Sequence, residues 1–371
     1  MRIFHLQHNS AQELEALPTQ PPGQGFVWIA CTRPAFQARL AELQATLQAL
    51  AGMQLVDLHV SDLLNEQLPS HYDYTSEYDL LVFRRLTTAA PGSPPAEPAL
   101  PRKRSGPPVL RRIDTRPVGL AVLGPVLLSV HPPDCAVREA YAARLLAKAA
   151  PELREGRSNP AAGARLPSSP SDLMLRLVNL MVDQYLDLRR DLTRQLDHWQ
   201  AELLQPSARF SNWSALLDAR LSLHLLDDIC EEQRTALQDW IDALATWELP
   251  DSAAGQRDLD LLKVRSRDVL EHIERVVHHV RRLEHSTETT VQMHFSVQSH
   301  RTNDIMRTLT VITAVFLPLN LTAAIFGMNF DALPLIHKPG GFWWAMGAMA
   351  GIALGLLLFF WRKRYLARTR A

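Results

Sequence analysis

Residues 301–329 read RTNDIMRTLTVITAVFLPLNLTAAIFGMN, and the run from Leu309 to Phe326 carries no charged side chain. As an α-helix this run would be about 27 Å long, close to the ~30 Å hydrocarbon core of a bilayer. A second uncharged run covers Phe342–Trp361 and has tryptophans at both ends, as lipid-facing helices often do. A short loop, mainly Asp331–Gly341, lies between the runs. The pattern predicts two membrane-spanning helices.

The first of these runs keeps polar groups at hydrophobic depth. Steps of three and four residues place one set of side chains on a single helix face. Either these groups bond across a helix interface or back to the helix carbonyls, or they line a water-filled pore. The candidate pore-lining residues are Asn303, Met306, Leu309, Thr310, Thr313, Leu317 and Asn320, and the face continues through Ala324 to Gly327.

The end of this helix favours the pore interpretation. Phe326 is followed directly by Gly327, Met328 and Asn329. Together with the preceding spacing, this tripeptide resembles the first membrane helix of the CorA family of divalent-cation channels. The matching residues are Asn303, Met306-Arg307, Leu309-Thr310, Phe316, Pro318 and Gly327-Met328-Asn329. The resemblance covers about seventy C-terminal residues, and it implies an α+β membrane protein that assembles as a cyclic homopentamer with a cytosolic funnel.

The resemblance also assigns roles to the residues. Gly327, Met328, Asn329 and Asp331 would form the outer mouth, where Asn329 carboxamides hold a hydrated cation by outer-sphere hydrogen bonds. Such neutral acceptors suit Mg²⁺, which sheds its water reluctantly. Met306 and Leu309 would form an apolar gate near the cytoplasmic end. The membrane potential would drive uptake, at about 4.6 kcal/mol for a divalent ion at 100 mV.

Two departures from the family pattern concern the metal and its regulation. Magnesium-type members usually carry a Glu after the loop proline, whereas Pro334 is followed here by Leu335. Asp331 is the only acid of the loop, so the choice among Mg²⁺, Co²⁺, Ni²⁺ and Zn²⁺ stays open, and a zinc or broader divalent transporter is one alternative. The family's regulatory carboxylates cannot be assigned to residues of this chain. A third hypothesis is an adaptor that its two helices only anchor to the membrane.

Composition and charge limit the partners and the cellular compartment that the chain can have. With 39 basic and 39 acidic residues the formal charge is zero, which gives no sign of nucleic-acid binding. The three isolated cysteines predict buried free thiols rather than a disulfide framework. Residues 1–30 contain no cleavable signal pattern. Basic residues flank both spans, so we expect an inner-membrane protein with both termini in the cytoplasm. The expected partners are lipids, divalent cations and further copies of the chain.

The chain before the spans divides into an α/β part and a helical part. Short strands are predicted at Arg2–Leu6, Phe26–Ala30, Glu77–Leu86 and Val118–Leu123. Gly124-Pro125 would turn the last of these into a hairpin with Val126–Val130, and a helix is predicted at Phe36–Leu50. Asp172 is the expected N-cap of the next helix, and a final helix of about seventy residues would begin near Gln256. The predicted segments are an α/β domain (1–154, with a disordered insert at 89–108), a linker (155–172), a stalk (173–307), the first span (308–326), an external loop (327–341), the second span (342–361) and a basic tail (362–371).

No catalytic signature is present. The chain has no phosphate-binding glycine loop, no GxSxG elbow and no HExxH or CxxC pair. Four histidines lie on the predicted stalk, but the i,i+7 pair of His272 and His279 is too far apart to share a metal within one chain. Surface histidines are the favoured interpretation of His272, His278, His279 and His285. We therefore expect no enzyme activity and no cofactor.

Overall fold

The computed structural model describes residues 1–7, 10–87, 113–133, 135–149, 166–203, 213–328 and 340–363. The chain divides into two compact units. The first contains Met1–Glu202 and Arg209–Glu288, and the second contains Leu203–Ala208 and Thr289–Ala371. The predicted insert at 89–108, most of the linker at 155–172 and most of the tail at 362–371 lie outside the described residues.

A seven-stranded sheet forms the centre of the first unit. Its order is β2-β1-β3-β7-β6-β5-β4, in which only the neighbours β3 and β7 are parallel. The predicted hairpin is present, since Leu123 pairs with Val126 across Gly124, whose φ of 50° is easily reached by glycine. The strands are β1 (Arg2–Gln7), β2 (Ser10–Leu14), β3 (Phe26–Thr32), β4 (His71–Tyr74), β5 (Asp79–Leu86), β6 (Thr115–Leu123) and β7 (Val126–His131).

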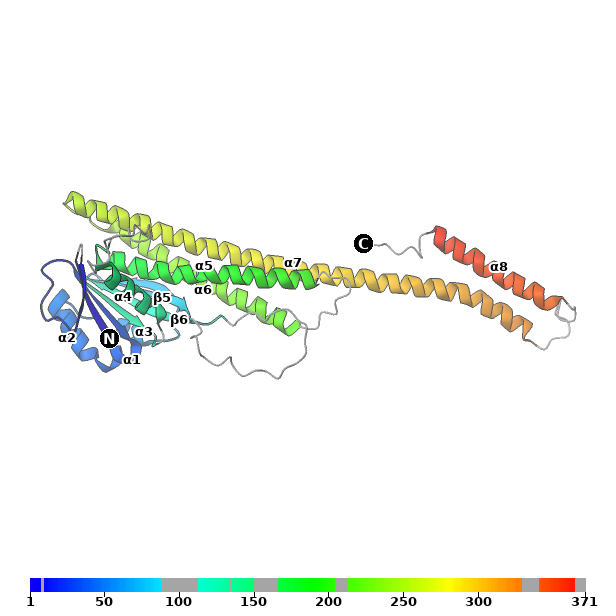
Figure 1. The fold of residues 1–371 in the computed structure, drawn as a ribbon, viewed down its shortest axis with the longest axis horizontal. Helices are drawn as coiled ribbons and strands as arrows, with labels where there is room; N and C mark the ends of the chain where they lie inside the picture. Colours follow the sequence, from blue (N-terminus) through cyan, green and yellow to red (C-terminus); the bar gives the residue numbers. More distant parts are fainter. Residues whose placement is uncertain are drawn as a thin grey trace. The chain divides into compact units, whose positions relative to one another are not determined.

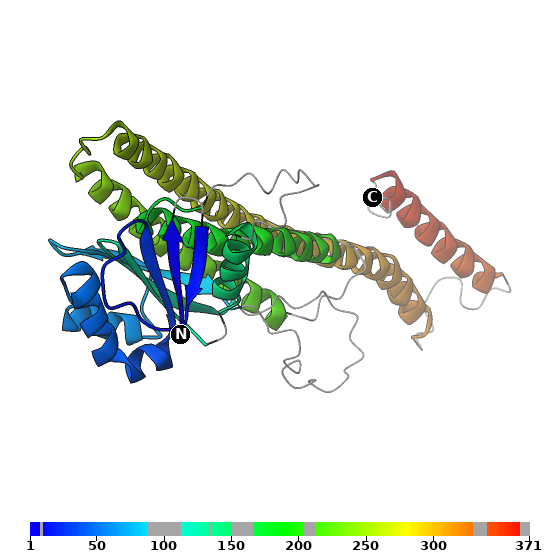
Figure 2. The same cartoon turned by 60° about the vertical axis from the view of Figure 1, so that its left-hand side comes forward.

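Helices cover both faces of this sheet (Figures 1 and 2). One face packs against α1 (Arg33–Ala38), α2 (Leu40–Ala51) and α3 (Asp57–Leu64), with a core that includes Ile29, Phe36 and Leu47. The other face meets α4 (Ala136–Ala149), α5 (Pro170–Leu203) and α6 (Trp213–Thr246). Because both faces are buried, β7 reads as an unbroken buried strand instead of an alternating one.

The second face is fixed to its helices by hydrogen bonds to one backbone carbonyl. The Tyr185 hydroxyl of α5 and the Gln233 amide of α6 both donate to the Arg84 carbonyl oxygen, at 2.9 and 2.7 Å. Deeper in this layer, Trp28 Nε1 donates to Ser129 Oγ at 2.8 Å, and Ser129 also meets His131 Nε2 at 2.9 Å. Buried polar groups of this kind need partners, so they fix the register of the layers.

The helix α7 (Ala253–Phe326) is 74 residues long and unbroken. It begins in the first unit and ends in the second. The predicted long helix is therefore confirmed, with a start three residues before Gln256 and a length of about 111 Å. In the first unit Trp240 Nε1 donates to Ser266 Oγ at 3.0 Å, and His279 Nε2 meets Thr193 Oγ1 at 2.8 Å, which join α7 to α6 and α5.

Two local predictions are wrong. The predicted helix Phe36–Leu50 is interrupted at Arg39, whose φ of −116° and ψ of 23° are not helical, so α1 and α2 are separate. The helix α5 begins before Asp172, and Ser169 is the capping side chain because its Oγ accepts the Asp172 N–H at 3.2 Å. Asp172 instead accepts the Ser168 N–H at 3.1 Å and pairs with Arg176 and Arg265.

The second unit contains the apolar end of α7 and the helix α8 (Gly341–Arg362), which runs back in the opposite direction (Figure 1). Both helices are long and apolar enough to cross a membrane. In the most apolar stretch of α8 none of the residues is buried, and in that of α7 only 11% are. Large apolar side chains such as Trp343 and Trp344 are exposed, which would be unfavourable in water and is normal in lipid.

Candidate ion pathway along α7

The seven predicted pore-lining residues all lie on α7 and all are exposed. Among the apolar ones, Met306 is 57% and Leu317 is 69% accessible. Gly327 and Met328 follow the last helical residue and are exposed as well. Asn329 and Asp331, which the sequence places at the mouth, lie outside the described residues.

The opposite face of the same helix is packed. Val311 is 2% and Val315 8% exposed, and Pro318 and Thr322 are half-buried. Successive helical residues are rotated by about 100°, so Val311 and Val315 lie roughly 160–200° from Thr313. The apolar end of α7 therefore has one packed face and, opposite it, a broad open side. This side carries the predicted stripe together with exposed apolar residues such as Phe316 and Leu321.

The threonines of this stretch donate their hydroxyl protons back to the helix. Thr310 Oγ1 donates to the Met306 carbonyl at 2.8 Å, and Thr313 Oγ1 donates to the Leu309 carbonyl at 2.9 Å. The back-bonding that the sequence left open is thus present. It does not exclude a pore, because each hydroxyl oxygen keeps lone pairs that point away from the helix.

Asn320 differs from the threonines. Its carboxamide is exposed and forms no hydrogen bond with the described residues. An unpaired carboxamide costs several kcal/mol in hydrocarbon, in the range of roughly 2–7 kcal/mol for an amide. A membrane position for this residue requires water or another polar chain beside it.

The last turn of the helix closes at Gly327. The Gly327 N–H donates to the carbonyls of Ala323 and Ala324 at 2.9 and 3.1 Å, and the Met328 N–H donates to Ile325 at 3.3 Å. A Cβ added at Gly327 would lie 3.3 Å from the Ala323 oxygen, which is tighter than ordinary contact. An added methyl group would therefore need a shift of a few tenths of an ångström at this turn.

The electrostatics of the stripe are neutral. No ionisable side chain lies between Leu309 and Phe326. The charged residues just before this stretch are Asp304 and Arg307, and Arg307 Nη1 lies 4.0 Å from Asp304 Oδ1. A neutral oxygen-lined face can bind a cation's water shell without the strong trapping that a ring of carboxylates would cause.

Among the described residues, the histidines and thiols form no competing metal centre. His272 Nε2 lies 3.8 Å from Asp268, and His279 bonds to Thr193. The residues that the structure describes contain no group of three or more His, Cys, Asp or Glu side chains that could hold a metal. Cys31, Cys135 and Cys230 are buried and free, as predicted.

Comparison with known sequences identifies the family. Residues 23–364 match the family described as CorA-like Mg²⁺ transporter protein, which is most of the chain. The chain belongs to this family. Its members are ion transporters rather than enzymes.

Individual relatives agree with this assignment over shorter stretches. The chain is 24% identical over 200 residues to the cobalt/magnesium transport protein CorA of Thermotoga maritima, which covers 52% of each sequence. It is 32% identical over 102 residues to the magnesium transport protein CorA of Haemophilus influenzae, covering 28% of this chain and 32% of that one. The chain thus matches about half or less of the length of these curated relatives.

The fold likeness extends over nearly the whole chain. The complete structure of the CorA magnesium transporter from Methanocaldococcus jannaschii superposes with a TM-score of 0.66 at 16% identity, covering 98% of both chains. The cytoplasmic domain of ZntB from Vibrio parahaemolyticus superposes with a TM-score of 0.53 at 12% identity, covering 82% of this chain and 98% of that one. At these identities the likeness concerns the fold alone.

The sequence interpretation missed one part of this site. It described the polar face of the first span but not the packed face, which is Val311, Val315, Pro318 and Thr322. The spacing of the two valines and Thr322, by four and seven residues, was a usable signal. This spacing did not reveal the packed face, because valine is equally suited to a face that contacts lipid.

Proposed function

We propose that this chain is a subunit of a ring of identical copies that conducts hydrated divalent cations, with Mg²⁺ as the main ion and Co²⁺ or Ni²⁺ as further substrates. One chain offers two membrane helices, which cannot enclose a water-filled path. Several copies around a cyclic axis can, and the family resemblance suggests five. The proposal places the protein in the inner membrane, with both chain termini in the cytoplasm.

The observation that carries this proposal is that one face of the apolar end of α7 is packed and the opposite face is exposed. Its packed face is used within one chain, whereas the opposite face, with Thr313 and Asn320, is left open. A polar open face is unfavourable in lipid and favourable around an aqueous axis. The open face therefore supports a pore made from several α7 helices.

The hydrogen-bond state of this face suits a hydrated metal ion. Water bound to Mg²⁺ is polarised and donates hydrogen bonds outward, so it needs acceptors. Thr310 and Thr313 have already given their protons to helix carbonyls and offer mainly acceptor lone pairs. The Asn320 amide oxygen adds another acceptor. The ion would thus pass without losing its inner water shell.

The apolar members of the stripe would form the gate. Met306 and Leu309 are 57% and 55% exposed on one chain and lie one turn apart where the uncharged part of α7 begins. Rings of such side chains can close a narrow pore sterically or by excluding water. Asn329 and Asp331 would form the outer mouth, where Asn329 carboxamides would receive the ion.

Proteoliposome flux of the purified full-length protein tests the proposal. We expect Mg²⁺ uptake that is driven by an inside-negative potential and blocked by hexammine-cobalt, which mimics a hydrated ion. Asn329→Ala should abolish uptake while the oligomer remains intact by size-exclusion chromatography. Asn212→Ala removes a carboxamide that lies more than 100 residues before the proposed mouth in the sequence, so it serves as the control and should transport normally.

Two other outcomes would contradict the proposal. Zn²⁺ uptake without Mg²⁺ uptake would favour a zinc transporter, an alternative that the missing acid after Pro334 supports. No flux of any divalent ion through the native protein, together with no rescue of growth in a strain lacking magnesium uptake, would favour a membrane-anchored adaptor.

A further inference from the structure

Two part-buried polar contacts join α5 to α7 in the first unit, where the helices lie side by side (Figures 1 and 2). Gln200 Nε2 donates to Ser286 Oγ at 2.7 Å, and His279 Nε2 lies 2.8 Å from Thr193 Oγ1. These four residues mark what we call the α5–α7 seam. The seam therefore contains a histidine, the side chain whose ordinary pKa lets its charge change between pH 5 and pH 8.

The position of the proton on His279 follows from the hydrogen bonds of Thr193. The Thr193 hydroxyl donates its proton to the Arg189 carbonyl at 2.9 Å, so its oxygen can only accept from the imidazole. Neutral His279 therefore carries its proton on Nε2 and donates it to Thr193, while Nδ1 stays unprotonated. A second proton binds at Nδ1 and leaves this hydrogen bond in place. The response of the seam to acid must therefore come from the added charge.

The charges that act on His279 are mostly positive. Arg189 of α5 and Arg282 of α7 oppose a positive imidazole, whereas Asp197 of α5 favours it. Burial, reinforced by the two arginines, lowers the pKa of His279 from its ordinary value of 6.5. A proton on this half-buried side chain places three cationic groups at the seam, and their repulsion pushes α5 and α7 apart. The seam is therefore fully formed above pH 6.5 and weakens as the pH falls.

His272, about two turns earlier on α7, meets the opposite charge. Its Nε2 lies 3.8 Å from Asp268 Oδ1, and Asp183 of α5 interacts with the same imidazole. A positive charge on His272 is thus neutralised by carboxylates instead of being repelled. Of these two histidines, only His279 weakens the contact between the helices when it takes up a proton.

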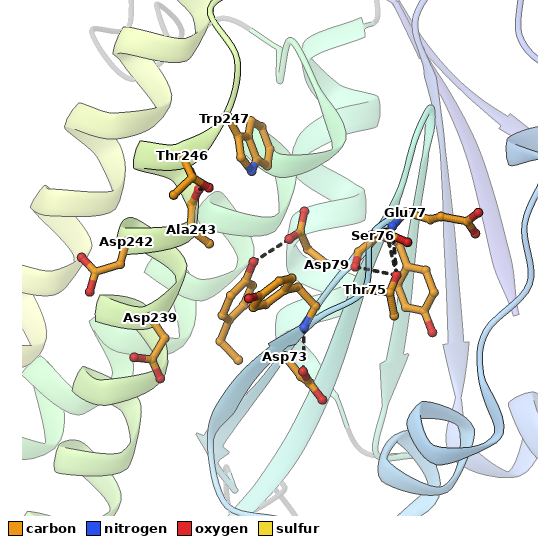
Figure 3. Close-up of a pocket in the computed structure, with 13 residues that line it drawn as sticks. Asp73, Thr75, Ser76, Glu77, Asp79, Asp239, Asp242, Ala243, Thr246 and Trp247 are labelled. Atoms are coloured by element: carbon orange, nitrogen blue, oxygen red, sulfur yellow. Dashed lines mark hydrogen bonds between the residues drawn. The ribbon is translucent and has the colours of Figure 1, made fainter.

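Another acid-sensitive group of the first unit belongs to a different contact. Asp79 lies in the cavity between the β4–β5 hairpin and the last turns of α6 (Figure 3), and burial raises the pKa of its carboxyl. It accepts the Tyr72 hydroxyl proton at 2.5 Å, within the same hairpin. Its protonation therefore changes a contact inside the hairpin and not the seam.

We propose that the contact between His279 and Thr193 is a proton-operated release, which holds α7 against α5 at neutral pH and loosens it when the solution becomes acidic. The helix α7 continues from the seam to Phe326 without a break, so a loosened seam reduces the support of the apolar stretch and lowers ion flux. The effect on flux rests on the proposed transport function, whereas the release of the seam does not.

Hydrogen–deuterium exchange of the full-length protein in lipid nanodiscs tests the release. After correction for intrinsic rates, we expect the amides of both helices at the seam to exchange at least threefold faster at pH 5 than at pH 7.5. His279→Gln keeps an N–H donor for Thr193 but cannot become charged, so it should remove this acid response. Arg189→Gln deletes one repelling charge and should reduce the response. His278→Gln removes the neighbouring exposed imidazole and should respond as the native protein does.

Equal exchange of the native seam at both pH values, or an undiminished acid response in His279→Gln, would overturn the proposal. Loss of the response in His278→Gln would overturn it too, because the effect would then belong to the exposed face. Mg²⁺ flux is measured separately in proteoliposomes, and we expect at least a twofold fall from pH 7.5 to pH 5 in the native protein but not in His279→Gln. Absence of flux at both pH values contradicts the transport function, and the exchange result still decides the release. A seam that responds to acid while flux does not overturns the link between the two.

Discussion

Val311 and Thr313 lie two residues apart on α7 and on opposite faces of it, with Val311 2% exposed and Thr313 open. The rotation between them is about 200°. This relationship divides the apolar end of the helix into a packed face and an exposed face. It also supplies matched pairs of residues for testing which face carries ions.

Thr313→Val should reduce Mg²⁺ flux several-fold without changing assembly. The substitution keeps the side-chain shape and removes the oxygen acceptor from the open face. Thr322→Val is the matched control, since Thr322 makes the same back-bond, to the Pro318 carbonyl at 2.8 Å, from the packed side. Proteoliposome uptake measures both. Equal loss in the two variants would assign the effect to helix stability instead of the pathway.

Gly327→Ala should lower transport more than Gly340→Ala. A Cβ at Gly327 meets the Ala323 oxygen at 3.3 Å, so the last turn of α7 must give by a few tenths of an ångström, directly before the proposed mouth. At Gly340, just before α8, nothing lies within 4 Å of an added Cβ. Flux per assembled oligomer is the measurement. Normal flux in Gly327→Ala would show that the helix end tolerates displacement.

Asp172→Ala should destabilise the first unit by about 3 kcal/mol. Its nearly buried carboxylate accepts the Ser168 N–H and pairs with Arg176 of α5 and Arg265 of α7. Removal deletes a terminal hydrogen bond and leaves two guanidinium groups without this partner. Urea denaturation followed by circular dichroism measures the change.

Asp187→Ala is the control for that experiment. Asp187 also lies on α5 and pairs with Arg190 at 3.2 Å, but both side chains are mostly exposed. We expect a change within about 0.5 kcal/mol, because surface ion pairs contribute little. A similar loss in both variants would contradict a special role for Asp172.

Acidification from pH 6.5 towards pH 3 should destabilise the first unit through His131. Burial, reinforced by Arg138, Arg85 and Arg33, lowers the pKa of His131 from 6.5 to about 3. In this window the unfolded chain binds a proton that the folded chain excludes. The stabilisation is therefore fully present above pH 6.5 and is lost as the pH falls, with a slope of up to about 1.4 kcal/mol per pH unit.

Urea unfolding at pH 7 and pH 5 checks this prediction. His131→Gln should flatten the dependence because it removes the titrating group, at some cost in stability at pH 7. His278→Gln makes the same change at an exposed position and should leave the pH dependence unaltered. If the free energy of unfolding of the native protein depends on pH no more strongly than that of His131→Gln, the prediction is wrong.

Much of the membrane part could be predicted from local sequence. The helix from Ala253 to Phe326 was predictable because no proline or glycine follows Gly255 until Pro318, and because its apolar residues repeat at helical spacing. Its end at Phe326 was predictable from Gly327. The β3 and β7 strands were predictable because most of their residues are apolar.

Other elements carried too little local signal. The strands β2 and β4 were missed because they are edge strands, SAQEL and HYDY, that are mostly polar and half-exposed. The helices α3 and α4 were missed as well. The break at Arg39 was missed because the apolar periodicity continues across it. The Ser169 cap was missed because Asp172 is an equally good capping residue by type.

By itself the sequence determined that the chain has two apolar helices, that one of them carries a polar face, and that this helix ends at Gly327. Those properties depend on the length of apolar runs and on helical periodicity, which are local. Only the tertiary structure decided that Val311 lies on a packed face, and that Tyr72 and Asp239 line one cavity from distant parts of the chain. Such relationships depend on how strands and helices pack, and no local pattern of residues encodes them.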